Sequence, residues 1–266
     1  MFLEKIVCSV KKRVEIAKAE RPLEKIIWQA LNMPPHQNQD YPFEKVLSAK
    51  TTADGIAFIC EVKKASPSKG VISHDYPYMQ IARDYMAGGA AAVSVLTEPE
   101  FFLGSGEHLR EISNSLPIPT LRKDFIIDPY QIYEAKILGA AAILLIAEIL
   151  DEAAMRDYMN TAHSLGLSVL AESHSLPQME KAISAGARVI GVNNRNLETF
   201  EVDINTSVKL RNKAPKELLF VSESGIRSSE DIAMLRENGV NAVLIGETLM
   251  RSPDRIKTLK ILRGAS

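Results

Sequence analysis

One short pattern occurs four times in the chain, at intervals of about 50 residues. In each copy a helix-like stretch ends in glycine, a small or apolar residue follows, and an apolar run typical of a buried strand comes next. The copies begin at Gly88, Gly139, Gly186 and Gly239. Because this interval is too long for one strand–helix unit but suits two, a second strand should lie within each interval.

Apolar, β-rich segments occur where the additional strands are expected. They cover residues 56–63, 119–123, 168–172 and 218–223, and helix-like segments include 128–138, 151–165, 175–185 and 228–238. Nearly continuous apolar strands that alternate with helices indicate a parallel sheet covered by helices. Eight such units in 266 residues favour an α/β fold of the (β/α)8 TIM barrel type.

The first 50 residues lie outside this repeat. Segments 3–20 and 22–31 have helical periodicity, and a polar, proline-bearing connector covers 33–42. We predict an N-terminal helical extension over residues 1–50, packed on a barrel formed by residues 51–266, as a single domain overall. We expect Trp28, the only tryptophan, to be buried in that packing. Whether the extension covers the active-site end or the side of the barrel is left open by the sequence.

Charge and cysteine content limit the classes of function. The formal net charge is -1, which gives no basic surface for nucleic acid. The longest apolar stretch, 139–150, is interrupted by Glu148, and the first residues lack the features of a signal peptide. Cys8 and Cys60 are far apart, so neither a disulfide framework nor a zinc site is indicated, and we expect Cys60 to be buried. We therefore expect a cytoplasmic protein without nucleic-acid or membrane partners.

The first predicted strand continues directly into charged residues. Its apolar run leads into Glu61 and Lys63, and a turn with Ser66 follows. Residues two apart in a strand face the same side, so Glu61 and Lys63 would project together from the C-terminal end of the strand. A surface ion pair would explain these two residues taken alone, and a catalytic site is the alternative.

Other strands also end in polar residues. If the strands close into a barrel, their C-terminal ends meet at one face, where enzymes of this fold carry the active site. The candidate catalytic residues at these ends are Glu61, Lys63, Lys123, Glu172, Asn193 and Glu223. We predict that they share one pocket, rather than each only solvating its own strand end.

The last two strands indicate a phosphate site. In this architecture the loops after strands seven and eight, with a helix N-terminus, present free backbone N–H groups to an anion. Ser224 with Gly225, and Gly246 with Glu247, stand at those places, and Ser66 could add a hydroxyl from the first loop. Glu247 would serve through its backbone N–H and turn its carboxylate elsewhere.

Two weaker patterns favour no further site. Glu172 and His174 could suggest a metal-binding pair, but no cluster of carboxylates or histidines supports it, and we predict no metal site. Residues 104–106 lack the third glycine of a dinucleotide-binding motif, and we predict a turn and helix start there.

Several motifs together resemble those of the indole-3-glycerol phosphate synthase family. They are EVKKASPSKG at 61–70, SVLTE at 94–98, FFLGS at 101–105, LRKDFIID at 121–128, NNRNL at 193–197 and SESGI at 222–226. The likeness extends from about residue 43 to residue 251. Leu103 and Ser173 depart from the family pattern, and neither stands at a catalytic position.

The resemblance implies that the chain closes 1-(2-carboxyphenylamino)-1-deoxyribulose 5-phosphate to an indole, with loss of carbon dioxide and water, in tryptophan biosynthesis and without a cofactor. It implies that Lys123 is the general acid at the C2 carbonyl and that Glu172 is the base of the later steps. Lys63 would hold the anthranilate carboxylate, with a share in the acid role left open. The two lysines in one pocket would help to lower the pKa that a lysine acid needs.

The same resemblance implies supporting roles for other residues. Glu61 would pair with the lysines, Asn193 would orient the sugar hydroxyls, and Glu223 would support them. The remaining substrate-binding residues would be Ser66, Phe102, Phe125, Arg195, Leu197 and Ser224, with the two phenylalanines and Leu197 forming a slot for the aromatic ring. The partner would be a phosphorylated small molecule, and association with other tryptophan-pathway enzymes is left open.

Two other functions are compatible with a barrel that has a phosphate site. Phosphoribosylanthranilate isomerase shares the barrel and the phosphate site but uses a Cys and Asp pair, and here Glu61 and Lys63 stand at the end of the first strand. A non-catalytic module that binds a phosphorylated ligand is the alternative from another class. The presence of every acid and base candidate argues against it.

Overall fold

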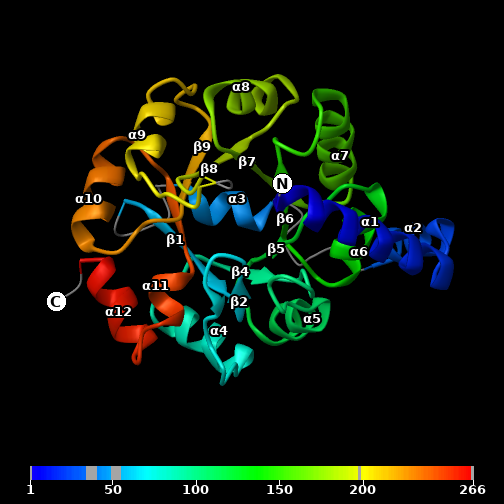
Figure 1. The fold of residues 1–266 in the computed structure, drawn as a ribbon, viewed down its shortest axis with the longest axis horizontal. Coiled ribbons are helices and arrows are strands. Elements are labelled where there is room, and N and C mark those ends of the chain that lie inside the picture. Colours follow the sequence, from blue (N-terminus) through cyan, green and yellow to red (C-terminus); the bar gives the residue numbers. More distant parts are fainter. Residues whose placement is uncertain (1, 34–40, 49–54, 197–198, 265–266) are drawn as a thin grey trace.

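The computed structural model describes residues 2–33, 41–48, 55–196 and 199–264. Within them, eight parallel strands close into a barrel surrounded by helices (Figure 1). The barrel strands are β1 (Ala57–Val62), β4 (Ala92–Leu96), β5 (Thr120–Lys123), β6 (Ala142–Ile146), β7 (Ser168–Ser173), β8 (Val189–Asn193), β9 (Leu219–Glu223) and β10 (Ala242–Ile245). Each strand pairs with its neighbour in the chain, and β1 pairs with both β4 and β10, which closes the ring. The predicted (β/α)8 barrel is thereby confirmed.

Helices follow the barrel strands as the sequence predicts. They are α4 (Tyr78–Ala87), α5 (Gly106–Ser115), α6 (Pro129–Ile137), α7 (Glu152–Ser164), α8 (Leu176–Ser184), α9 (Asn205–Arg211), α10 (Ser229–Glu237), α11 (Glu247–Met250) and α12 (Arg255–Leu262). Side chains of Asp128, Asp151 and Ser228 accept hydrogen bonds from first-turn N–H groups of α6, α7 and α10. Such caps satisfy N–H groups that have no partner inside the helix, and they explain why these helices begin where the sequence indicates. Ser105 caps α5 in the same way, as expected for a turn and helix start.

The loop after β1 contains a small hairpin that the sequence pattern does not reveal. Its strands are β2 (Ala65–Ser66) and β3 (Gly70–Val71), which pair in antiparallel fashion. Gly70 has φ = 63°, a left-handed conformation that glycine adopts without steric cost. The hairpin holds Ser66 beside the end of β1.

Alternate strand residues belong to two separate apolar layers. Ala57 and Ile59 belong to the cluster that fills the barrel interior. Phe58 and Cys60 belong to the cluster between the strands and the outer helices. Cys60 is fully buried in that outer layer, as predicted. Because side chains alternate along a strand, the β1 residues that stand an even number of positions from Ile59 also face the barrel interior.

Helix α3 (Pro42–Leu47) closes the N-terminal end of the barrel. Its Phe43 and Leu47 are fully buried and cluster with Ala57, Ala92 and Ala142 at the strand starts. Small alanines leave the space that the two large side chains of α3 fill. The opposite end of the barrel is thereby the end available for a site.

Two further helices precede α3: α1 (Phe2–Glu20) and α2 (Leu23–Leu31). They lie against α6 (Figure 1). Val10 and Val14 of α1 cluster with Ile26 of α2 and Tyr130 of α6. The expectation for Trp28 is wrong, because its side chain lies on the outer face of α2 and is 66% exposed. No helix among the described residues is long and apolar enough to cross a bilayer.

Candidate active site

The predicted charged side chains lie at the open end of the barrel, because of their positions along the strands. Glu61, Lys123, Glu172 and Glu223 each stand two residues after an apolar member of the interior cluster. The strand pairing sets Asn193 level with Glu223 across β8 and β9. The alternation that builds the core therefore also gathers the charges above it.

These residues line a cavity of about 380 Å³ at the C-terminal ends of the strands. A cavity of this size suits a small-molecule ligand. The predicted residues that line it are Glu61, Lys63, Ser66, Phe102, Lys123, Phe125, Glu172, Asn193, Arg195, Glu223, Ser224, Gly225, Gly246 and Glu247. Leu197 lies outside the described residues.

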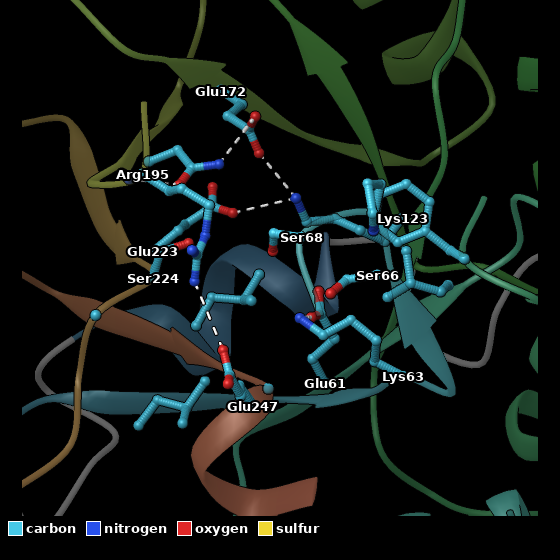
Figure 2. Close-up of a pocket in the computed structure, with 18 of the residues that line it drawn as sticks. Glu61, Lys63, Ser66, Ser68, Lys123, Glu172, Arg195, Glu223, Ser224 and Glu247 are labelled. Atoms are coloured by element: carbon cyan, nitrogen blue, oxygen red, sulfur yellow. Dashed lines mark hydrogen bonds and ion pairs between the residues drawn. The ribbon is translucent and has the colours of Figure 1, made fainter. Parts of the chain in front are cut away.

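Lys123 occupies the centre of the charged group. Its Nζ lies 2.8 Å from Oε2 of Glu172 and 3.2 Å from Oε2 of Glu223, and Figure 2 shows it between the two carboxylates. The side chains of both glutamates are at most 4% exposed. Asn193 donates a 3.5 Å hydrogen bond to the other oxygen of Glu172. One ammonium thus contacts two buried glutamate side chains.

The carboxylates keep Lys123 protonated. Burial alone lowers the pKa of Lys123, but the Glu172, Glu223 and Glu61 carboxylates outweigh burial and raise that pKa well above its ordinary value. The expectation of a lowered lysine pKa is therefore wrong. The expectation relied on Lys63 as a cationic neighbour of Lys123, but Lys63 pairs with Glu61 at 2.5 Å.

The two glutamates beside Lys123 have opposite charge states. Burial raises the pKa of Glu172, but Lys123, His174 and the hydrogen bonds to Glu172 outweigh it, and the resulting pKa is about 2. Burial raises the pKa of Glu223 to about 8, and the nearby Glu172 carboxylate adds to the rise while Lys123 opposes it. Oε1 of Glu223 has no hydrogen-bond partner among the described residues. Glu172 is therefore the ionised partner of Lys123, and Glu223 is protonated near neutral pH.

The proposed phosphate end has backbone in unusual conformations. Ser224 and Gly225 have φ values of 67° and 83°, so two successive residues after β9 are left-handed. Gly246 lies so close to Glu61 that an added Cβ would come within 2.5 Å of its Oε1. Thr248 donates a 2.8 Å hydrogen bond to the carbonyl of Ile226, which joins the two loops. This hydrogen bond ties the segment after β10 to the loop after β9.

The carboxylate of Glu247 pairs with cationic side chains. It faces Arg195, with 3.6 Å between Oε2 and Nη2 (Figure 2). Arg251 and Lys69 approach the other oxygen at 3.2 and 3.8 Å. Three cations thus surround the carboxylate of Glu247.

Sequence reasoning missed several lining residues. Arg227 and Arg251 add positive charge to the phosphate end, and Leu3 and Ile6 of α1 add apolar wall. Arg251 stands four residues after Glu247 on one helical turn, a spacing that could have identified it. Leu3 and Ile6 could not be found in this way, because only the folded chain brings α1 to the cavity.

A second missed feature ties α1 to the walls of the cavity. Nη2 of Arg13 lies 2.8 Å from Oδ1 of Asp124, whose carboxylate also accepts hydrogen bonds from Thr97 and Arg122. Burial raises the pKa of Asp124, but Arg122 and Arg13 outweigh burial and hold that pKa below its ordinary value. Asp124 lies between Lys123 and Phe125, so this buried network fixes two lining residues at once.

Glu172 and His174, the pair considered for metal binding, lie close together. Nε2 of His174 lies 3.7 Å from Oε1 of Glu172, and no group of three possible metal ligands gathers among the described residues.

A family model described as "Indole-3-glycerol phosphate synthase" matches residues 3–262. Two relatives carry the same name. The protein from Ruminiclostridium cellulolyticum is 51% identical and covers 100% of both chains. The protein from Endomicrobium trichonymphae is 50% identical and covers 99% of this chain and 100% of its own.

Solved structures share the fold at low sequence identity. The 3-hexulose-6-phosphate synthase from Salmonella typhimurium superposes with a TM-score of 0.65 at 12% identity, over 79% of this chain and 98% of that one. At this identity the likeness shows the fold alone.

Proposed function

Because the chain belongs to the indole-3-glycerol phosphate synthase family, we propose that it converts 1-(2-carboxyphenylamino)-1-deoxyribulose 5-phosphate to indole-3-glycerol phosphate. The reaction is a carboxy-lyase step of tryptophan biosynthesis. It needs an acid for a carbonyl oxygen, a base for a carbon-bound proton, and a pocket that holds a carboxylate against apolar walls.

The observation that carries this proposal is the contact of Lys123 with Glu172. A protonated ammonium and an ionised carboxylate lie 2.8 Å apart in a buried site. Lys123 would protonate the C2 carbonyl oxygen as the ring carbon attacks C2. Glu172 would then take the proton from C1, and the hydroxyl would leave as water. Each group already has the protonation state that its step requires.

The walls of the cavity suit the aromatic part of the substrate. Phe102 and Phe125 lie with ring centroids 6.0 Å apart, and Lys63 lines the same cavity. Lys63 would hold the anthranilate carboxylate, with Glu61 keeping its ammonium in place and Leu197 completing the slot. Loss of carbon dioxide is favoured when the carboxylate leaves water for apolar surroundings.

The phosphate would bind at the other side of the cavity. Backbone N–H groups of Gly225, Gly246 and Glu247 would face it, with hydroxyls from Ser66 and Ser224. Arg195, two residues after Asn193, would support the sugar phosphate. Asn193 would orient the sugar hydroxyls, and protonated Glu223 would donate rather than accept a hydrogen bond there.

The surroundings of the barrel belong to the same proposal. Residues 1–50 would serve as an extension of the 51–266 barrel, since α1 supplies Leu3 and Ile6 to the cavity. A cytoplasmic location suits a chain whose Cys8 and Cys60 are both free. Association with other tryptophan-pathway enzymes would be tested by co-purification with them.

The direct test is to mix purified protein with the carboxyphenylamino-deoxyribulose phosphate. We expect indole fluorescence to rise together with carbon dioxide release, above the constant emission of Trp28. Lys123→Ala should abolish turnover and largely preserve substrate binding. Saturable binding without turnover by the unmodified protein would contradict the synthase and support a binding module.

A further inference from the structure

Glu172 has a neighbour on the side that faces away from the cavity. His174 stands two residues later on the same strand end, and Nε2 of its ring lies 3.7 Å from Oε1 of Glu172. The ring does not line the cavity, and its side chain is 11% exposed. Neither ring nitrogen has a hydrogen-bond partner among the described residues. Buried polar atoms without partners are uncommon, and they often mark a functional role.

The other side of the ring faces the protein surface. Nδ1 of His174 lies 3.8 Å from Oε2 of Glu148, whose side chain is 33% exposed. Gln178 of α8 holds this arrangement, because it accepts a 2.7 Å hydrogen bond from the His174 backbone and donates one of 3.5 Å to Glu148. A line of three ionisable groups therefore leads from the base in the cavity to solvent.

The proposed reaction needs such a route, because it consumes a proton. The bond to the leaving carboxylate breaks, its electron pair returns to the ring, and carbon dioxide departs without a proton. The ketone oxygen leaves as water and takes two protons. C1 releases one of them to Glu172, so one proton per turnover must come from solvent. Substrate in the cavity would block the direct path to Lys123 and Glu172.

We propose that Glu148 and His174 form a relay that delivers this solvent proton to Glu172. Glu148 takes a proton from water and passes it to Nδ1 of His174. The ring then releases a proton from Nε2 to Glu172, and Glu172 passes one to Lys123 across their 2.8 Å contact. Imidazole suits the middle step, because it both accepts and donates protons near neutral pH. The inference rests on the proposed synthase function.

The relay requires motion of the His174 ring, because of the distances from its nitrogens to Glu148 and to Glu172. Both are longer than a hydrogen bond, so the ring must rotate to shorten one gap and then the other. His174 acts through Glu172 and does not touch the substrate, which makes it a positioning and relay residue.

Chemical rescue tests the relay. His174→Gln keeps the shape and polarity of the side chain but cannot carry a proton, and we expect kcat to fall roughly 10²-fold, the lower end of what one positioned proton donor contributes, with KM nearly unchanged. Millimolar imidazole should restore kcat in proportion to its concentration. Glu148→Gln, at an exposed position that tolerates change, should show a smaller loss that imidazole also restores. His108→Gln, in α5, is the matched control and should match the unmodified protein.

The outcomes separate the relay from the synthase. If the unmodified protein turns the substrate over and His174→Gln has the same kcat, the relay is wrong and the synthase stands. A loss of kcat that imidazole does not restore also overturns the relay, because it indicates a structural role. Absence of turnover in the unmodified protein removes both proposals.

Discussion

The two ends of the barrel use the same inward-facing strand positions for opposite purposes. At the N-terminal end, Ala57 and Ala92 pack against Phe43 and Leu47 of α3, and all four are at most 1% exposed. At the C-terminal end, the corresponding positions carry carboxylates around Lys123. The height of a residue along its strand, rather than its inward direction, decides whether it stabilises the fold or performs chemistry.

This difference has an energetic side. The apolar end gains free energy from removing large side chains from water. The charged end removes ionised groups from water, which is costly unless they are paired. Glu223 shows the cost, since its pKa of about 8 reflects a carboxyl group that burial keeps protonated. We therefore expect substitutions at the two ends to separate stability from turnover.

The largest effect should come from Lys123, which we expect to contribute to both turnover and stability. Lys123→Ala removes the proposed acid, and we expect kcat to fall roughly 10³- to 10⁴-fold. It also leaves Glu172 and Glu223 buried without a cation, which should lower the free energy of unfolding by about 3 kcal/mol or more. Steady-state kinetics and urea unfolding measure the two losses. Lys123→Arg, which keeps the charge, should retain most of the stability and little of the turnover.

At the apolar end only stability should change. Phe43→Ala should lower the free energy of unfolding by about 3–5 kcal/mol, because it leaves a cavity beneath the strands. The kcat of the folded protein should stay within about twofold of the original. Phe43→Leu provides the control and should lose much less stability. A large fall in kcat in folded Phe43→Ala would show that the two ends are coupled.

The charged end should also give stability its own pH dependence. Between the ordinary glutamate pKa of 4.5 and the folded value of about 8, the folded protein holds a proton on Glu223 that the unfolded chain releases. The free energy of unfolding should therefore fall as pH rises through this range. Glu223→Gln should remove this fall. Parallel pH profiles for the two proteins in urea unfolding would contradict the raised pKa.

The smallest effect should come from the exposed side of the extension. Trp28 is 66% exposed, so Trp28→Ala should change the free energy of unfolding by less than about 0.5 kcal/mol. Ile26 on the same helix is fully buried, and Ile26→Ala should cost about 2–5 kcal/mol. Circular dichroism during urea unfolding measures both. Equal losses would mean that Trp28 has a partner that covers it.

The barrel could be predicted from the sequence because its repeat is regular. Each strand–helix unit can be identified from local signals. These are the glycine at the helix end, the apolar run of the strand, and capping residues such as Asp151 and Ser228. The cap by α3 could not be predicted, because a helix of six residues has too little periodicity. The error at Trp28 has a similar cause, since periodicity does not say which apolar face of α2 packs.

The membership of the site could also be predicted, but its charge states could not. Strand alternation and barrel closure are enough to bring Glu61 and Glu172 to one end. The raised pKa of Lys123 depends on three carboxylates from different strands, and their distances are set only by the closed barrel. The contact of Arg13 with Asp124 spans 111 residues and left no local pattern.

The most direct test of the division between the two ends is a crossed comparison of Glu172→Gln with Phe43→Ala. Glu172→Gln removes one of the carboxylates that raise the pKa of Glu223, so Glu223 can ionise and pair with Lys123 in place of Glu172. We therefore expect kcat to fall roughly 10²- to 10⁴-fold while the free energy of unfolding changes by less than about 1 kcal/mol. Phe43→Ala should show the reverse pattern in the same two measurements. If each variant lost both turnover and stability to a similar degree, the account of two separate ends would be contradicted.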